Sequence, residues 1–244
     1  WCRDLNIPAR SHRKYWEYVY IMRVLEVENL LKAGVKALGF GVGQEPMIPV
    51  FAKRELNCLV TDLEPSAAAE KGWSQTEQHF SLVEQFAEFG TCSVETIKNQ
   101  INHRFVDMNS IPADLRQGQF DFVWSCCALE HLGSLDAGLR FIESSLESVK
   151  PGGLAIHTTE FNVSSTELTV DHEATVLYRK QDIEGLISRL KSRGHEISVN
   201  WSTGSHEFDK IYDVPPFHPH LHLKVKLDQY VTSSIGLIIR KAHS

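Results

Sequence analysis

The chain has 244 residues, of which 42% are hydrophobic and 23% are charged, as is ordinary for a globular protein with a substantial core. Its formal net charge is -6, whereas domains that bind nucleic acid usually carry a strong basic excess, so we expect no nucleic-acid partner. No apolar run approaches the roughly 18 residues of a membrane span, and we expect none.

The five cysteines occur in no spacing that is typical of metal ligands. An odd number of cysteines fits buried thiols in a reducing compartment better than a disulfide framework, so we expect a cytoplasmic protein. The chain begins at Trp1 rather than at a methionine, which leaves its natural N-terminus open.

Residues 1–34 form an extension ahead of the first glycine-rich motif. Residues 1–10 are polar and predict an arm, whereas the apolar positions between 11 and 31 recur at helical spacing and predict a helix. The basic side chains at its start are Arg10, His12, Arg13 and Lys14. They suit either a basic rim that attracts an anionic substrate or a solvated helix start, which is the usual role of a charge run.

Residues 35–46 predict a strand, a tight turn and the start of a helix. A short apolar run leads into Gly39, Gly41 and Gly43, and the following Pro46 is accepted in the first turn of a helix. A second apolar run ends in Asp62, about twenty residues past the turn. A carboxylate at that distance suits binding of the two hydroxyls of a ribose, so the two motifs together indicate a nucleotide-binding α/β unit.

Apolar runs and helical patterns continue to alternate toward the C-terminus. We expect further helices over 63–69, 93–100, 133–149 and 182–193, and further strands over 104–106, 120–125, 154–159, 197–201 and 234–239. The last two strands have no evident helix between them, which favours antiparallel pairing. The expected fold is α/β: a Rossmann-like, seven-stranded, mostly parallel sheet with an antiparallel last strand and helices on both faces, forming one domain over 1–244.

Five motifs stand in an order that resembles the class I S-adenosylmethionine-dependent methyltransferases. They are Leu38 to Gly43, Val60 to Asp62, Val106-Asp107-Met108, Asp121 to Ser125 followed by Leu129-Glu130-His131, and Lys150-Pro151-Gly152-Gly153. The match covers residues 35–160, and a strand stands in the family's seventh place near the end. The whole chain further resembles a bacterial group of such enzymes that is often linked to polysaccharide biosynthesis.

The resemblance implies that the protein binds S-adenosylmethionine and releases S-adenosylhomocysteine. It assigns cofactor binding to Gly39, Gly41, Gly43, Glu45, Asp62, Leu63, Asp107, Met108 and Ser125. In this assignment the glycines let backbone approach the cofactor, Asp62 accepts hydrogen bonds from the ribose, and Asp107 accepts one from the adenine amino group. Ser125 lies beside the methionine part. All of these positions fall at carboxyl ends of strands, where ligands of open α/β sheets bind.

Two positions depart from the family pattern. Gly39 replaces the usual acid of the first motif, which often holds the methionine ammonium group, and Glu45 replaces the usual third glycine. Glu45 either takes over the ammonium group or is a helix-start acid favoured by the helix dipole.

The implied reaction is methyl transfer to a small polar acceptor, for which a sugar hydroxyl in glycan biosynthesis is one candidate. Such an enzyme aligns donor and acceptor and removes a proton from the hydroxyl. Candidates for the catalytic groups are Glu130, His131 and Glu160. His157 precedes the strand end, where a hydrogen-bonded core histidine is the favoured interpretation, and Asn162 suits orienting an acceptor hydroxyl.

Many potential metal ligands occur in the second half of the chain: His157, Glu160, His172, His218, His220 and His222. Their spacing matches no standard site, so a divalent metal is possible but not expected. We expect the long insertion over 203–230 to form a lid or wall over the acceptor pocket. Trp73 and His79 suit either a lining of the cofactor site or plain surface.

Two other functions compete with methyl transfer. An NAD(P)-dependent oxidoreductase also has a glycine turn and a ribose acid, but here Pro46 ends the glycine motif and Glu45 would repel a pyrophosphate. A non-catalytic methyltransferase-like scaffold is favoured by the missing acid at Gly39. The oligomeric state is not predicted.

Overall fold

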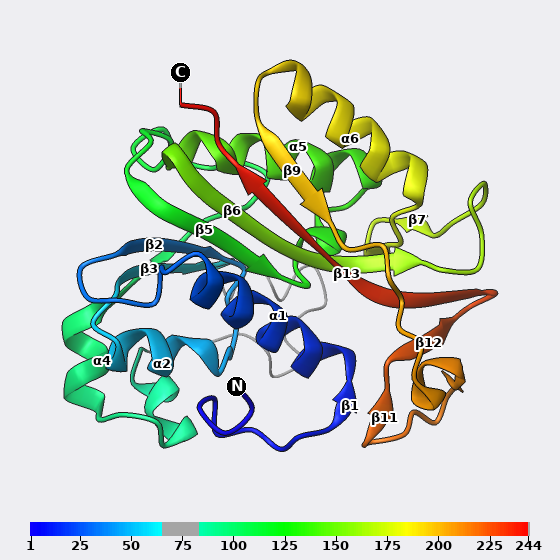
Figure 1. Cartoon of the computed structure of the whole chain (residues 1–244), viewed down its shortest axis with the longest axis horizontal. Coiled ribbons are helices and arrows are strands. Elements are labelled where there is room, and N and C mark those ends of the chain that lie inside the picture. Colours follow the sequence, from blue (N-terminus) through cyan, green and yellow to red (C-terminus); the bar gives the residue numbers. More distant parts are fainter. Residues whose placement is uncertain (65–82, 244) are drawn as a thin grey trace.

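The computed structural model describes residues 1–64 and 83–243 (Figure 1). Within this part of the chain, nine strands form one sheet in the order β10-β12-β13-β6-β5-β2-β3-β4, with β9 also paired to β13. Five parallel strands form its centre: β2 (Lys36–Phe40), β3 (Asn57–Asp62), β4 (Ile101–Phe105), β5 (Phe120–Cys126) and β6 (Val149–Asn162). The strand β13 (Tyr230–Arg240) runs antiparallel to both β6 and β9 (Glu196–Val199).

Helices cover both faces of the sheet, and each face has its own hydrophobic core (Figure 1). One face packs against α1 (Arg13–Val27), α2 (Met47–Lys53) and α4 (Val94–Gln100). The other packs against α5 (Leu135–Ser145) and α6 (Lys180–Ser192). Because successive strand residues point to opposite faces, Ala37 joins the first core and Leu38 the second. None of the described helices is long and apolar enough to cross a membrane.

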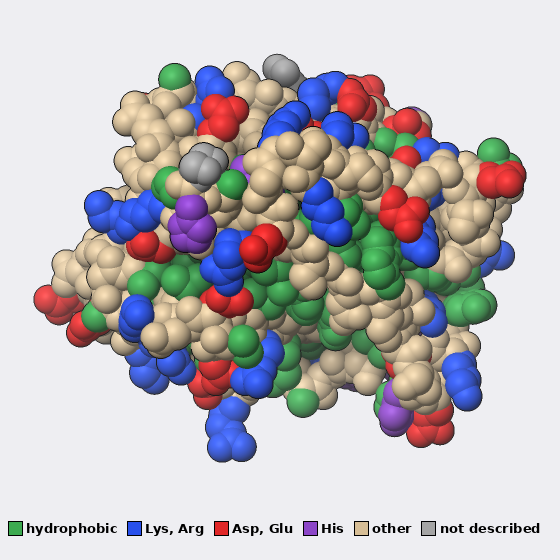
Figure 2. Space-filling model, turned by 45° about the horizontal axis from the view of Figure 1, so that its top comes forward, with side chains coloured by type: hydrophobic (Ala, Val, Ile, Leu, Met, Phe, Trp, Pro, Cys, Tyr) green, Lys and Arg blue, Asp and Glu red, His purple; other side chains and the backbone are tan. Residues whose placement is uncertain are grey.

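Several short elements complete the described chain. They are β1 (Ser11–His12), β7 (Asp171–His172), β8 (Thr175–Val176), β10 (Tyr212–Asp213), β11 (Leu221–His222) and β12 (Lys224–Leu227), with the 3-10 turns η2 (Val83–Phe89), η3 (Leu129–His131), η4 (Leu146–Ser148) and η5 (Glu207–Lys210). The face drawn in Figure 2 mixes acidic and basic side chains without a large field of one sign.

The mostly parallel sheet with an antiparallel last strand confirms the expected fold class, but the sheet is wider than the seven strands predicted. The two additional strands among the described residues, β10 and β12, come from the insertion over 203–230, and β12 pairs with β13. These strands are too short to stand out as apolar runs in the sequence. A third strand of the insertion, β11, pairs in parallel with β1 and so braces the start of α1.

The boundaries of several elements differ from those predicted. The strand β6 already begins at Val149 and runs through the Pro-Gly-Gly turn motif, with an irregular register between Phe120 and Phe122 on its partner strand. The helix α5 ends at Ser145, where a 3-10 turn follows. The predicted helix over 63–69 lies mostly outside the described residues, and Trp73 and His79 lie outside them entirely.

Candidate functional site

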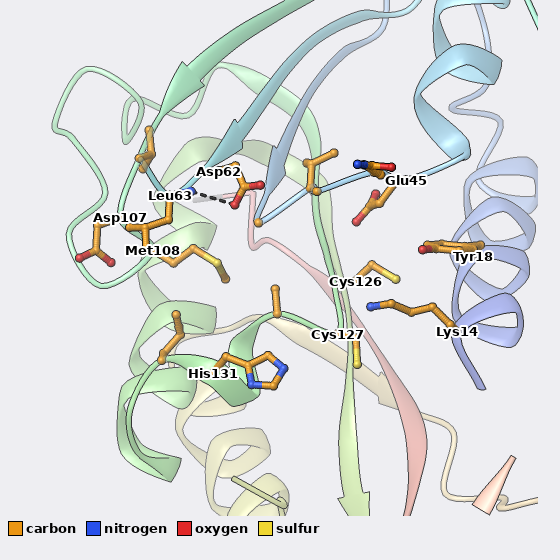
Figure 3. A pocket seen from close by; sticks show the side chains of 17 residues that line it. Lys14, Tyr18, Glu45, Asp62, Leu63, Asp107, Met108, Cys126, Cys127 and His131 are labelled. Atoms are coloured by element: carbon orange, nitrogen blue, oxygen red, sulfur yellow. Dashed lines mark hydrogen bonds between the residues drawn. The ribbon is translucent and has the colours of Figure 1, made fainter. Parts of the chain in front are cut away.

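A cavity of about 310 Å³ lies at the carboxyl ends of the central strands, with α1 as its opposite wall (Figure 3). Of the nine predicted cofactor residues, seven line it: Gly41, Gly43, Glu45, Asp62, Leu63, Asp107 and Met108. Further lining residues include Lys14, Tyr18, Cys126, Cys127, Ala128 and His131. The tips of β2, β3 and β5 and the loop that follows β4 therefore meet at one concave site.

The glycine turn after β2 brings backbone to the cavity wall. Gly41 has a φ of +59°, and a Cβ built there would lie 2.8 Å from the Cβ of Ala128 and 3.1 Å from the sulfur of Met108. Any side chain at this position would be strained and would fill the cavity edge. Gly39 lies within β2 behind the wall, where a Cβ would collide with the indole of Trp124 at 2.3 Å. Trp124 thus fills the space that a side chain at position 39 would need.

Asp62 lies at the tip of β3 with its carboxylate turned toward the cavity (Figure 3). The side chain is only 5% exposed, and its Oδ1 accepts a hydrogen bond of 2.8 Å from the backbone N–H of Leu63. Asp107 is exposed at the rim, where its Oδ1 accepts from the N–H of Asn109 at 2.8 Å, while Met108 is buried. The two carboxylates therefore lie at one end of the cavity with an apolar side chain beside them.

Glu45 lies at the other end of the cavity, just before α2. Its Oε2 accepts a hydrogen bond of 2.9 Å from Nε1 of Trp124, whereas its Oε1 is buried without a hydrogen-bond partner. The side chain is 3% exposed, and burial raises its pKa to about 8. A buried carboxyl oxygen without a partner at a cavity wall is suited to accept a hydrogen bond from a bound ligand.

The helix α1 contributes two cavity residues that sequence reasoning did not assign. In the sequence, Lys14 belongs to a run of basic residues at a helix start, and nothing distinguishes Tyr18 from the aromatic residues around it. In the structure they lie one turn apart on α1, and their polar ends point toward the cavity (Figure 3). The spacing of four residues places them on one helix face, but the sequence gives no signal that this face meets the tips of the strands.

Ser125 lies next to the cavity without lining it, because its hydroxyl is engaged on the other side of β5. Ser145 donates to the carbonyl of Ile142, so its oxygen accepts from Nε2 of His157 at 3.3 Å. Nδ1 of His157 then accepts from the hydroxyl of Ser125 at 2.8 Å. Burial lowers the pKa of His157 to about 3. This confirms the interpretation of His157 as a hydrogen-bonded core histidine.

The three catalytic candidates lie in different surroundings, and only His131 lines the cavity. Its Nδ1 lies 2.9 Å from the carbonyl oxygen of Ala174. A carbonyl only accepts hydrogen bonds, so Nδ1 carries the hydrogen and Nε2 is the basic nitrogen of the neutral ring. Glu130 and Glu160 are buried beside the cavity without lining it.

A buried polar network engages both glutamates. Arg13 from α1 forms an ion pair with Glu160, and its Nη1 lies 3.2 Å from Sγ of Cys127. The thiol of Cys127 donates to Oε1 of Glu130 at 2.7 Å, and Thr159 donates to Oε2 at 3.0 Å. Burial raises the pKa of Glu130 above its ordinary value. The network ties α1 to the ends of β5 and β6.

Among the described residues, one group of potential metal ligands converges: Cys127, Glu130 and Glu160, whose ligand atoms lie within 4.8 Å of one another. The guanidinium of Arg13 already supplies a positive charge to this group. The other potential ligands, His157, His172, His218, His220 and His222, do not join it. Instead His222 contacts Asp213 at 2.5 Å and stacks on His12.

No protein-family model and no curated protein matches the sequence. Solved structures do match in fold. An S-adenosylmethionine-dependent methyltransferase from Clostridium acetobutylicum aligns over 92% of this chain and 90% of its own, with a TM-score of 0.52 and 11% identity. One from Mesorhizobium loti aligns over 90% and 96%, with a TM-score of 0.52 and 12% identity.

The chain has the class I methyltransferase fold. The [4+2]-cyclase SpnF shares it, with a TM-score of 0.57, 16% identity and coverage of 92% of this chain and 82% of its own. Because this one fold carries proteins described by different reactions, the function has to be argued from the cavity and its residues.

Proposed function

We propose that the protein is an S-adenosylmethionine-dependent methyltransferase that acts on a small polar acceptor. The observation that carries this proposal is the position of Asp62, a buried carboxylate at the tip of β3 that faces a cavity beside the glycine turn. Such a group is suited to the two hydroxyls of a ribose. The neighbouring solved structures described as S-adenosylmethionine-dependent methyltransferases support the proposal by fold.

The residues present fit this cofactor along the whole cavity. Gly41 leaves room for close backbone approach, Asp62 and Met108 form the adenosine end with Asp107 at the rim, and the orphaned oxygen of Glu45 faces the opposite end. When bound, S-adenosylmethionine supplies a methyl group on a cationic sulfur. Gly39, Leu63 and Ser125 support the cavity through packing or backbone rather than by a side-chain hydrogen bond into it.

His131 is the group that we assign to the acceptor proton. It is the catalytic candidate that lines the cavity, and its orientation by Ala174 leaves Nε2 as the basic nitrogen. Glu130 and Glu160 act through the buried network by holding Cys127 and Arg13 in place. A hydroxyl acceptor, such as a sugar hydroxyl in the synthesis of a glycan, suits a histidine base.

The test of the proposal is cofactor binding by the variant Asp62→Ala. Isothermal titration with S-adenosylhomocysteine should show a loss of at least about 100-fold relative to the unchanged protein, because hydrogen bonds to a charged group are worth about 1.5–3 kcal/mol each. Asp136→Ala, at a carboxylate exposed on α5, is the matched control and should bind normally. Equal affinity of Asp62→Ala and the unchanged protein would refute the assignment.

The strongest competing function is that of a non-catalytic scaffold, because two of the three catalytic candidates are engaged in a buried network. Incubation with labelled S-adenosylmethionine and a panel of hydroxylated acceptors separates the two functions. Transfer of label supports the enzyme, and binding without turnover on every acceptor supports the scaffold. An NAD(P)-dependent oxidoreductase is disfavoured because Pro46, rather than glycine or alanine, ends the glycine motif. Titration with NADH tests that alternative.

A further inference from the structure

The cavity has a polar end on α1 that the proposed adenosine contacts leave unused. Tyr18 is only 7% exposed, yet its hydroxyl makes no hydrogen bond to any described residue. Lys14, one turn earlier, forms no ion pair within the described part of the chain. Both polar ends point into the cavity (Figure 3). A largely buried hydroxyl and an ammonium group that forms no ion pair, both on one wall, are suited to an anion.

Glu45 faces the same end of the cavity from the other wall. Its Oε1 is buried without a partner, and Lys14 is near enough to act on its carboxyl group electrostatically. One end of the cavity therefore presents a cation and a hydroxyl donor beside the unsatisfied oxygen of a carboxyl group. This combination is complementary to a group that carries both charges, and an α-amino acid is such a group.

We propose that Lys14 and Tyr18 bind the carboxylate, and Glu45 the ammonium group, of the amino-acid end of the cofactor. This inference rests on the proposed function and adds α1, an element outside the sheet, to the cofactor site. It also accounts for the glycine at position 39. The acid that Gly39 lacks is supplied across the cavity by Glu45, while Trp124 fills the space and orients Glu45 by a hydrogen bond of 2.9 Å.

The helix α1 is fixed firmly enough to hold these two side chains in place. On a neighbouring face of the helix, the fully buried Glu17 accepts hydrogen bonds from Ser234 and, at 3.0 Å, from Thr158. Arg13 adds the ion pair with Glu160. A site held by a packed and hydrogen-bonded helix loses little free energy to ordering when its ligand binds.

The experiment compares two ligands that differ only at this end. S-adenosylhomocysteine carries the amino-acid end, and 5′-methylthioadenosine has a methyl group in its place. Isothermal titration with both is performed on the unchanged protein, Lys14→Met, Tyr18→Phe and Glu45→Gln. Lys53→Met and Tyr212→Phe change an exposed lysine and an exposed tyrosine away from the cavity and serve as controls.

We expect Lys14→Met to weaken S-adenosylhomocysteine binding by about 10- to 100-fold and Tyr18→Phe by about 5-fold, in line with charged and neutral hydrogen bonds. We expect Glu45→Gln to weaken it by about 10-fold or more. The affinity for 5′-methylthioadenosine should stay within about twofold in every variant, which also shows that the variants are folded. Lys14→Arg should retain most of the affinity of the unchanged protein, because it keeps the charge.

Two results would overturn the inference. One is unchanged S-adenosylhomocysteine affinity in Lys14→Met and Tyr18→Phe. The other is an equal loss for both ligands, which would indicate that α1 only supports the fold. If the unchanged protein binds neither ligand, the proposed function itself fails. This outcome differs from the two results above, in which the unchanged protein still binds S-adenosylhomocysteine.

Discussion

At the scale of single residues, the site combines side chains whose roles follow from what they already contact. Both oxygens of Glu130 accept hydrogen bonds, from Cys127 and Thr159, and Oε1 of Glu160 forms an ion pair with Arg13. His131 lines the cavity with Nδ1 fixed by a carbonyl. These contacts are the reason for proposing His131, rather than either glutamate, as the group that accepts the proton.

The variant His131→Asn tests this role. Its amide can still donate to the carbonyl of Ala174, so the cavity wall should keep its shape while the basic nitrogen is lost. We expect turnover on an acceptor found with the labelled cofactor to fall about 100-fold, in the range of general-base effects, with S-adenosylhomocysteine affinity unchanged. The control is His220→Asn, at an exposed histidine of the 203–230 segment. Turnover within about twofold of the unchanged protein would refute the assignment.

At the scale of elements, α1 is the part of the site whose surroundings differ most from those expected from its sequence. Its first turn carries basic residues that fit a solvated surface, yet Arg13 enters a buried ion pair and Lys14 lines the cavity. The insertion over 203–230 remains only a proposed lid. What the structure describes is a brace, in which β11 pairs with β1 and His222 stacks on His12 at the start of the helix.

The docking of α1 depends on Glu17, and Glu17→Ala tests this dependence. The substitution leaves the hydroxyls of Thr158 and Ser234 without their buried acceptor, so we expect a loss of about 3 kcal/mol in the free energy of unfolding, measured with urea. Glu17→Gln keeps an acceptor oxygen and should lose less. Equal stability of Glu17→Ala and the unchanged protein would show that other contacts dock the helix.

At the scale of the whole molecule, the sheet and the strand-tip part of the site were predictable from the sequence, whereas the contacts across α1 were not. Gly41, Asp62 and Asp107 follow apolar runs, and the ends of parallel strands meet at one edge. The positions of Lys14 and Tyr18 at the cavity depend on how α1 packs against the sheet. Local sequence patterns do not encode this tertiary packing. Ser125 was predicted at the cavity, but β5 continues to Cys126 and turns at Cys127, whose φ is 52°.

The pH dependence of stability is a property of the whole chain, and Glu45 is one of the buried groups that contribute to it. Burial raises the pKa of Glu45 to about 8 from 4.5, with Lys14, Asp62 and Glu17 as the charged groups around it. Between these values the unfolded chain has released a proton that the folded protein still holds. This contribution to stability is therefore complete below pH 4.5, declines as pH rises and is lost above pH 8.

Urea unfolding of Glu45→Gln and the unchanged protein from pH 5 to pH 9 measures this contribution. We expect the free energy of unfolding of the variant, relative to that of the unchanged protein, to increase by about 4 kcal/mol from pH 5 to pH 9. One pKa unit corresponds to about 1.4 kcal/mol. Glu88→Gln, at an exposed glutamate, is the control and should show no such trend. A constant difference between Glu45→Gln and the unchanged protein would contradict the expected protonation of Glu45.

The parallel pairing of β1 with β11 limits where this chain can be joined to a related sequence in a chimeric protein. A crossover point between α1 and the 203–230 segment would take β1 and β11, which pair with each other, from different parents. The resulting hybrid would take β1 and α1 from one parent and the paired strand β11 from the other. Exchange of 1–34 together with 203–230, as a matched set, keeps that partnership intact.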